Sequence, residues 1–167
     1  MAKNWKIRKD LSIEVCGHTL FRIECTQDFK EIKSGTLGGY IEKEENLDGN
    51  AWVYGDAKVF GDAWVFGNAW VFGNAQVYGN AKVFGDKITN KDDICYVSNR
   101  YYNITITPLH IKIGCQYHAQ VAWWNFTDEQ IEKMDGESAL NFWKIWKEPL
   151  KQICDAMKKE KGEKDVK

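Results

Sequence analysis

A six-residue repeat constrains the fold of this chain more than any other feature of its sequence. From Gly49 to Phe84, six consecutive units follow the order Gly, Asn or Asp, Ala, any residue, Val, aromatic residue. Two looser units precede them, with Ile41 and Leu47 at the Val position. Residues two apart on an extended strand point to the same side, so the Ala and Val of each unit face one interior. Gly followed by Asn or Asp makes the corner, because these residues tolerate backbone angles that others avoid.

A strand this short cannot bury its apolar face alone, so successive turns of the chain must stack. The pattern resembles the hexapeptide-repeat proteins, whose coils are three-sided, so that every third unit returns to the same side. The resemblance implies a short left-handed parallel β-helix over residues 37–88, although generic parallel crossovers are right-handed. One departure is that an aromatic residue follows each inward Val, where the family often places Gly. With three units to a turn, the aromatic residues stack in the pairs Tyr54 over Phe72, Phe60 over Tyr78 and Phe66 over Phe84.

The unconstrained fourth position of each unit predicts a surface. By the same rule Trp52 lies over Trp70, and Ile88 follows if the register holds for one more turn. Large exposed apolar stripes usually mark a partner surface. We therefore predict that these three residues form the interface of a homo-oligomer, with a trimer preferred because hexapeptide coils commonly associate as trimers. The alternative is that C-terminal helices of the same chain cover this wall.

The stacked strands expose unpaired edges, so the flanking sequence is expected to cap the coil. Residues 1–36 predict an N-terminal β-hairpin cap, in which two alternating segments begin at Leu11 and Leu20. Gly17 and His18 between them predict the hairpin turn, which leaves His18 a structural residue.

After the repeat the composition changes, and residues 89–160 predict a C-terminal α+β domain of three strands followed by helices. Thr127 begins a capping box for a short helix, and Ser138 caps a longer one. We expect Pro149 to kink or restart the longer helix. The charged tail at residues 161–167, together with the charged residues just before it, is expected to be disordered. The fold class is therefore mainly β.

Composition limits the partners. The formal net charge is −1, from 23 basic and 24 acidic residues, so the chain has no global field to attract nucleic acid or a membrane surface. No direct DNA or RNA binding and no membrane association are expected. Five scattered cysteines make a disulfide framework improbable, which favours a reducing cytosol.

A more specific resemblance covers most of the chain. Gly35-Thr-Leu-Gly-Gly-Tyr-Ile-Glu and Glu45-Asn-Leu before the repeats, then Ile113-Gly-Cys-Gln-Tyr-His and Trp124 after them, are similar to a group of phage and prophage hexapeptide-repeat proteins. The resemblance implies a phage protein in the cytosol of a bacterial host. It brings no established activity with it.

Enzymatic readings find little support in the residues. Hexapeptide acyltransferases use a His as general base near the coil, whereas residues 37–84 contain none, and His18, His110 and His118 all lie outside. Cys115 and His118 could form a nucleophile–base pair, or a metal site with His110 and Cys95. The spacing is loose, and a buried Cys beside a hydrogen-bonded His is the more common arrangement. We therefore expect no catalytic residues, no metal and no cofactor.

The C-terminal region is the predicted ligand or partner site, because polar groups converge there. Arg can pair with a phosphate, His can donate a further hydrogen bond, and Trp can stack on a base. The predicted site comprises Arg100, Cys115, Gln116, His118, Trp123 and Trp124. The alternative is that both tryptophans belong to the core and Arg100 is a solvated turn residue.

These observations favour a non-catalytic, oligomeric phage protein that counters host immunity, either by sequestering a nucleotide signal or by blocking a defence protein. Two alternatives stay open. One is a hexapeptide-type acyltransferase or a degenerate relative of that class. The other is a structural component of the phage.

Overall fold

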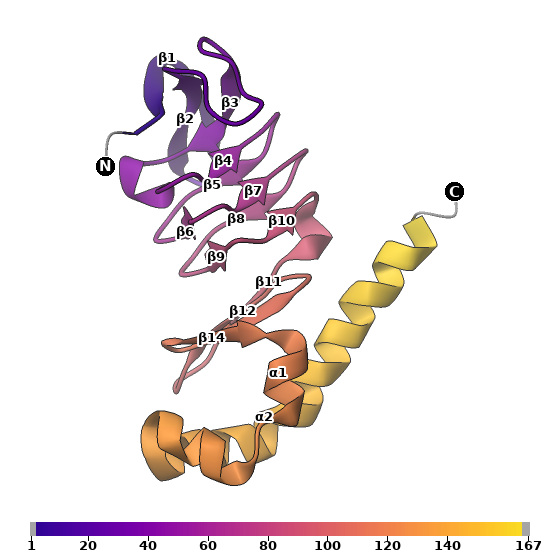
Figure 1. The fold of residues 1–167 in the computed structure, drawn as a ribbon. Coiled ribbons are helices and arrows are strands. Elements are labelled where there is room, and N and C mark those ends of the chain that lie inside the picture. Colours follow the sequence, from indigo (N-terminus) through magenta and orange to yellow (C-terminus); the bar gives the residue numbers. More distant parts are fainter. Residues whose placement is uncertain (1–2, 165–167) are drawn as a thin grey trace.

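The computed structural model describes residues 3–164 and is mainly β. The chain runs from an N-terminal hairpin through a column of short stacked strands to a second sheet, which two helices cover (Figure 1). Two separate hydrophobic cores follow this order: one inside the stacked strands, and one between the second sheet and the helices. None of the described helices is long and apolar enough to cross a membrane.

The N-terminal hairpin consists of β1 (Trp5–Val15) and β2 (His18–Cys25), which pair antiparallel as predicted. The turn is at Cys16 and Gly17, whose φ angles are 50° and 82°, so His18 begins β2 and does not belong to the turn. β2 pairs in turn with β3 (Leu37–Ile41), and β3 pairs parallel with the first coil strand of its wall. The hairpin therefore covers one edge that the coil would otherwise leave unpaired.

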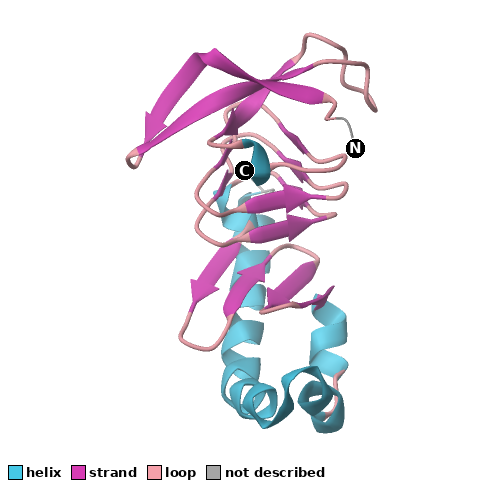
Figure 2. Cartoon of the chain, turned by 90° about the vertical axis from the view of Figure 1, so that its left-hand side faces the viewer, coloured by secondary structure: helices cyan, strands magenta, loops and turns pink. Residues whose placement is uncertain are grey.

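Residues 37–88, the coil, pass repeatedly around three walls (Figure 2). Parallel pairing joins Trp52 to Trp70, Lys58 to Gln76 and Trp64 to Lys82, which confirms that every third unit returns to the same wall. The walls consist of β3–β5–β8, β4–β7–β10 and β6–β9. After β3, the coil strands are β4 (Trp52–Val53), β5 (Lys58–Val59), β6 (Trp64–Phe66), β7 (Trp70–Val71), β8 (Gln76–Val77), β9 (Lys82–Phe84) and β10 (Lys87–Ile88).

The interior of the coil is built from the repeated Ala and Val. The predicted burial is confirmed, since all six Val side chains of the regular units are fully buried: Val53, Val59, Val65, Val71, Val77 and Val83. Lys58, Gln76 and Lys82, at the unconstrained fourth position, point outward and are half-buried. The aromatic ladder also forms: the ring centroids of Tyr54 and Phe72 are 4.9 Å apart. Those of Phe60 and Tyr78 are 5.5 Å apart, and those of Phe66 and Phe84 5.0 Å.

One side chain supplements strand pairing at the N-terminal end of the third wall. The short 3-10 helix η1 (Glu44–Asn46) ends just before Leu47, which pairs parallel with Val65 of β6 as an isolated bridge. The buried amide of Asn46 donates hydrogen bonds to the carbonyls of Gly61, at 3.0 Å, and Ala63, at 2.8 Å. These carbonyls are thereby satisfied without a further strand.

The prediction that Ile88 belongs to an exposed apolar wall is wrong, because the last unit of the repeat lacks its Ala. Lys87 pairs with Trp70, where an unbroken repeat would have placed Ile88, so the last turn is shorter by a single residue. Ile88 then lies under Val71 and is fully buried in the interior. Asp86 takes the place of the missing Ala: its carbonyl accepts from the Trp70 N–H, as the carbonyls of the repeated Ala residues do.

Trp52 is also not part of an exposed wall. Its side chain is fully buried, and the ring of Phe29, from the segment between β2 and β3, lies 6.3 Å from it. The N-terminal segment that includes Phe29 therefore covers Trp52, and the C-terminal helices do not. Trp70 stays half-buried, with the Lys30 ammonium 4.9 Å from its ring centroid. Of the predicted interface, only Trp70 is accessible on the surface of this chain.

The second sheet is an antiparallel meander of four strands, in the order β11–β12–β13–β14. Three of them were predicted: β11 (Cys95–Ser98), β12 (Asn103–Ile106) and β13 (His110–Ile113). β14 (Gln116–Ala119) and the short helix α1 (Gln120–Asn125) were not. A short 3-10 helix, η2 (Lys91–Asp93), leads from the coil to this sheet.

The last element, α2 (Asp128–Lys164), joins the two predicted helices. The capping box is confirmed, since the side chains of Thr127 and Gln130 each accept a hydrogen bond from the other's backbone N–H. The non-helical backbone within α2 is at Asp135 and Gly136, so the kink predicted at Pro149 is wrong. The disorder expected near the C-terminus is wrong as far as Lys164, where the helix ends, and residues 165–167 lie outside the described part.

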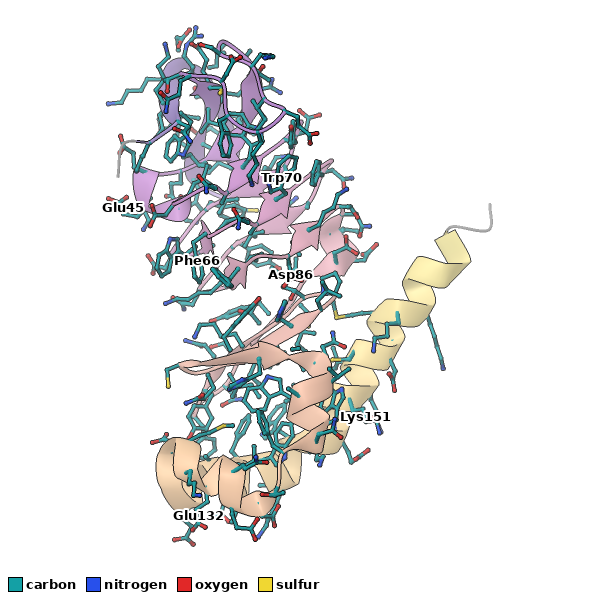
Figure 3. The ribbon with its side chains drawn as sticks, viewed as in Figure 1. Glu45, Phe66, Trp70, Asp86, Glu132 and Lys151 are labelled. Atoms are coloured by element: carbon teal, nitrogen blue, oxygen red, sulfur yellow. The ribbon has the colours of Figure 1, made fainter. Side chains whose placement is uncertain are left out.

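A buried polar cluster joins the coil to the second sheet. Asp86 lies where the two halves meet (Figure 3), and its side chain is 0% exposed. Its Oδ2 accepts from Thr107 Oγ1 at 2.6 Å and from His110 Nδ1 at 2.9 Å. Tyr117 donates its hydroxyl hydrogen to the Phe84 carbonyl and stacks on the His110 ring, with 4.7 Å between centroids. This junction cluster fixes β12, β13 and β14 against the last turn of the coil.

We predict that Val77→Asp prevents stable folding, whereas Gln76→Asp on the same strand does not. Val77 is fully buried, and an uncompensated charge there costs about 3–5 kcal/mol. Gln76 points outward and is half-buried. Urea unfolding followed by circular dichroism compares the two variants, and equal stabilities would contradict the assigned inward and outward positions.

A second prediction concerns the junction cluster. His110→Ala should destabilise the protein by about 1–3 kcal/mol, because the buried Asp86 carboxylate loses a donor. Asp86→Ala removes the buried charge and restores the residue type of the repeat. The double variant, which carries both substitutions, should therefore be more stable than His110→Ala alone in chemical unfolding. If its loss of stability equals the sum of the losses in the two single variants, the residues are not coupled.

Candidate functional site

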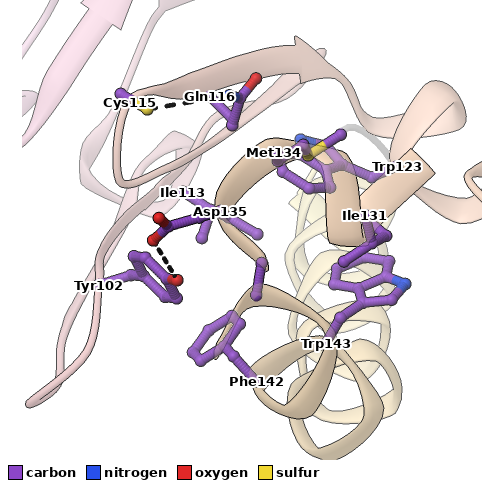
Figure 4. A pocket seen from close by; sticks show the side chains of 11 residues that line it. Tyr102, Ile113, Cys115, Gln116, Trp123, Ile131, Met134, Asp135, Phe142 and Trp143 are labelled. Atoms are coloured by element: carbon purple, nitrogen blue, oxygen red, sulfur yellow. Dashed lines mark hydrogen bonds between the residues drawn. The ribbon is translucent and has the colours of Figure 1, made fainter. Parts of the chain in front are cut away.

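Three of the six predicted site residues line a small apolar pocket between the second sheet and the kink of α2 (Figure 4). Its volume is about 40 Å³, and the side chains around it are mostly aliphatic and aromatic. Eleven residues line it: Tyr102, Ile113, Cys115, Gln116, Trp123, Ile131, Met134, Asp135, Ala139, Phe142 and Trp143. It lies within the second core, so it is a packing hollow with a polar rim.

The structure brings together only part of the predicted site. Cys115, Gln116 and Trp123 line the pocket. His118 contacts Trp123 edge-on, with 5.3 Å between ring centroids, and lies 3.2 Å from Gln116 Oε1 through its Nε2 atom. Trp124 does not line the pocket and stacks on Trp143, which also belongs to the core.

Arg100 is separate from the other predicted residues. It is exposed in the connection between β11 and β12, and its guanidinium lies 5.0 Å from the ring centroid of Tyr101. Arg100 does not line the apolar pocket.

Trp123, which lines the apolar pocket, is buried, and its indole N–H donates to the Ile111 carbonyl at 2.8 Å. The alternative that the tryptophans belong to the core is therefore correct for Trp123.

The electrostatics of the apolar pocket disfavour an anion. Asp135 lies at its rim and accepts a hydrogen bond from the Tyr102 hydroxyl at 2.8 Å. Burial, together with the Asp135 carboxylate, raises the pKa of Tyr102 to about 12. Burial lowers the pKa of His118, which favours the neutral imidazole at pH 7. With so little room, a carboxylate and a neutral His, this pocket does not suit a nucleotide, since ligand sites usually measure about 300–1,000 Å³.

The four-residue metal reading finds no geometric support. Among residues 3–159, whose side chains the structure describes, no three His, Cys, Asp or Glu residues gather closely enough to hold a metal ion. Cys115 is exposed and free, whereas Cys95 is half-buried, and burial raises the pKa of its thiol. His110 is committed to Asp86 through Nδ1.

A second hollow, the junction groove, lies where the third wall of the coil meets the second sheet. Its volume is about 340 Å³. It is lined by Asn80, Lys82, Tyr101, Tyr102, Asn103, Thr105, Lys112 and Gly114, so residues from both halves of the chain converge on it. Polar and aromatic side chains dominate this set, and none of them is acidic.

The positive charge of Lys82 affects the pKa of Lys112 in the junction groove. Lys112 is half-buried, and its ammonium donates to the carbonyl of Gly114. Burial lowers its pKa, and the positive charge of Lys82 lowers it further. Neither lysine forms a salt bridge within the described part of the chain.

Sequence reasoning missed this groove because its parts are far apart in the chain. Lys82 occupies the unconstrained fourth position of its unit, which predicts only an outward side chain, and its ammonium lies 5.5 Å from the ring centroid of Trp64. Lys112 alternates with Ile111 and Ile113, which marks it as pointing away from the second core. Local sequence patterns do not reveal that β12 docks beneath β9, where the Lys82 N–H donates to Thr105 Oγ1 at 3.1 Å.

Neither the protein-family models nor the curated protein sequences with which the chain was compared give a match. The resemblance to phage hexapeptide-repeat proteins therefore stays a prediction. The function has to be argued from the geometry of this chain.

We predict that Gly136→Ala destabilises the protein by about 1–3 kcal/mol. Gly136 has φ 65° and ψ −157°, a region open almost only to glycine, and it makes the kink that closes the apolar pocket. An added Cβ would meet no atom within 4 Å, so the cost is backbone strain alone. Thermal unfolding should separate this variant from the neighbouring control Glu137→Ala, and equal melting temperatures would contradict the assigned backbone conformation.

Proposed function

We propose that this chain is a non-catalytic binding protein of the phage hexapeptide-repeat type, which counters host immunity by capturing a component of the defence. In this proposal the coil is a left-handed β-helix and acts as a rigid scaffold. The captured component is a nucleotide signal or a defence protein. The three walls, and the return of every third unit to the same wall, support the coil type, and the hexapeptide resemblance supplies the hand.

The observation that carries the binding proposal is the junction groove. A hollow of about 340 Å³ falls within the usual size range of small-molecule sites. Half of its lining residues belong to strands β9, β12 and β13, and the junction cluster around Asp86 holds the two halves together beside it. Sites on rigid elements lose little conformational entropy on binding, which favours capture of a ligand.

One observation favours the alternative of a hexapeptide-type acyltransferase. His110 donates its Nδ1 hydrogen to Asp86, and a His oriented by a carboxylate is a common general base. The buried position of Asp86 also gives the pair a structural role, as the link between coil and sheet. A structural role in the phage particle is the third reading, and no contact among the described residues favours it.

Self-association also belongs to the proposal, with a trimer preferred on the hexapeptide resemblance. The surface available for it is reduced, because Trp52 and Ile88 are buried within the chain. Trp70, with Phe72 beside it at 5.5 Å between centroids, is the remaining aromatic part of that wall. Copies of the junction groove would then repeat around the oligomer.

The proposal predicts that the protein rescues phage infection. Expressed in bacteria that carry a defence system, it should raise the plating efficiency of a phage that the system restricts. Gln76→Asp, which keeps an outward polar position, should rescue equally well, and Val77→Asp should not. Failure of the wild type in hosts with nucleotide-signalling defences and in hosts with other defences would contradict the proposal.

Two further measurements separate the other readings. If the protein is an acyltransferase that uses His110 as its base, the purified wild type releases free thiol from an acyl-thioester donor and folded His110→Ala does not, whereas a binding protein releases none. If the protein is a structural component, deletion of its gene abolishes infectious particles in hosts without any defence system. Mass spectrometry of purified particles would then find the chain in the virion.

A further inference from the structure

We infer that the junction groove binds a free nucleotide, with Lys82 and Lys112 as ligands of its phosphates and Tyr101 as the surface on which its base stacks. This inference rests on the proposed binding function and gives the class of ligand. It moves the ligand site away from the predicted residues Cys115, Gln116 and Trp123, which line the apolar pocket.

Two lysines from distant parts of the chain line the junction groove. Lys82 extends from β9, the last strand of its wall, and Lys112 extends from β13 in the second sheet. Asn80 and Asn103 add amide groups to the same lining. Ammonium and amide groups are donors that can hold phosphate oxygens.

The lining of the junction groove leaves its positive charge uncompensated. Both lysines line a partly enclosed space, and none of the other described residues in that lining is acidic. Bringing like charges together and removing them from water costs free energy, which the lowered pKa of Lys112 reflects. A bound phosphate would neutralise both groups, so its binding removes a repulsion that the free protein carries.

The two lysines of the junction groove are held in place before a ligand binds. The Lys82 backbone is fixed at both edges of β9: β6 pairs with one edge, and Thr105 Oγ1 accepts the Lys82 N–H at 3.1 Å on the other. The Lys112 ammonium is held by the Gly114 carbonyl at the tight turn between β13 and β14. The donors therefore need little reordering when a ligand enters.

An exposed aromatic ring favours a nucleotide over a simple anion. Tyr101 lines the groove and is 62% exposed, which leaves the face of its ring away from Arg100 open for stacking. The guanidinium of Arg100 lies 5.0 Å from the centroid of that ring and adds a positive charge at the edge of the groove. An aromatic ring beside cationic side chains is the usual arrangement where proteins bind a base together with its phosphates.

Calorimetry with ADP, pyrophosphate, adenosine and a short single-stranded oligonucleotide tests the inference on the full-length protein. ADP should bind more tightly than pyrophosphate, because the base adds stacking, and adenosine should not bind measurably. The oligonucleotide carries the same chemistry in a polymer. Tighter binding of the oligonucleotide than of ADP would overturn the assignment to a free nucleotide.

Two variants test the lysines. Lys82→Gln and Lys112→Gln should each weaken ADP binding about tenfold or more, as expected for the loss of a charged hydrogen bond. Gln occupies the position equivalent to Lys82 one wall earlier, at Gln76, so the coil accepts this side chain. Lys58→Gln, on the wall of β5, is the matched control and should bind ADP like the wild type. Melting temperatures verify that each variant is folded.

The inference is overturned if the folded wild type binds no ADP at millimolar concentration, or if both lysine variants bind ADP as tightly as the wild type. The phage-rescue assay separates such a failure from failure of the proposed function. If Lys82→Gln and Lys112→Gln lose ADP binding but rescue infection fully, the protein acts on host defence through another surface, and the nucleotide is not the captured component. If the nucleotide is the captured component, both variants lose rescue while Lys58→Gln retains it.

Discussion

The rest of the structure depends on the stacking of each six-residue unit on the third unit after it along the chain. Because Trp52 pairs with Trp70 and Val53 with Val71, identical side chains lie over one another on this wall. The inward Val residues form a dry interior, and the aromatic residues form ladders along the outside. Strands of two or three residues are stable here only because each of them adds to such columns.

The junction groove exists because of the way in which the last turn of the coil ends. The last unit lacks its Ala, so the register shortens and a carboxylate, Asp86, takes the small inward position. A buried carboxylate needs donors, and the second sheet supplies them from Thr107 and His110. The sheet is thereby fixed beneath the last turn, and the side chains of Lys82 and Lys112 are left facing one hollow.

The sequence predicted the parts that repeat and missed the parts that do not. Inward Val, stacked aromatics and paired fourth positions follow from local periodicity, which one chain reveals without a structure. Ile88 was assigned to the wrong face because one missing residue inverts a strand. Trp52 was assigned to the correct outer face, but a distant segment that includes Phe29 covers it. The structure separates the expected site residues for a related reason: Trp123 belongs to the core, whereas Lys82 and Lys112 line one groove only through tertiary docking.

The central claim is that the end of the coil and the second sheet together form a site for a phosphate-bearing ligand. Native mass spectrometry of the protein purified from infected cells tests it most directly, because it weighs each oligomer together with whatever is bound. The account predicts a bound small molecule that contains phosphate, present with the wild type and absent with Lys82→Gln. Recovery of the same bound molecule with both proteins, or of the wild type with no bound small molecule at all, would contradict it.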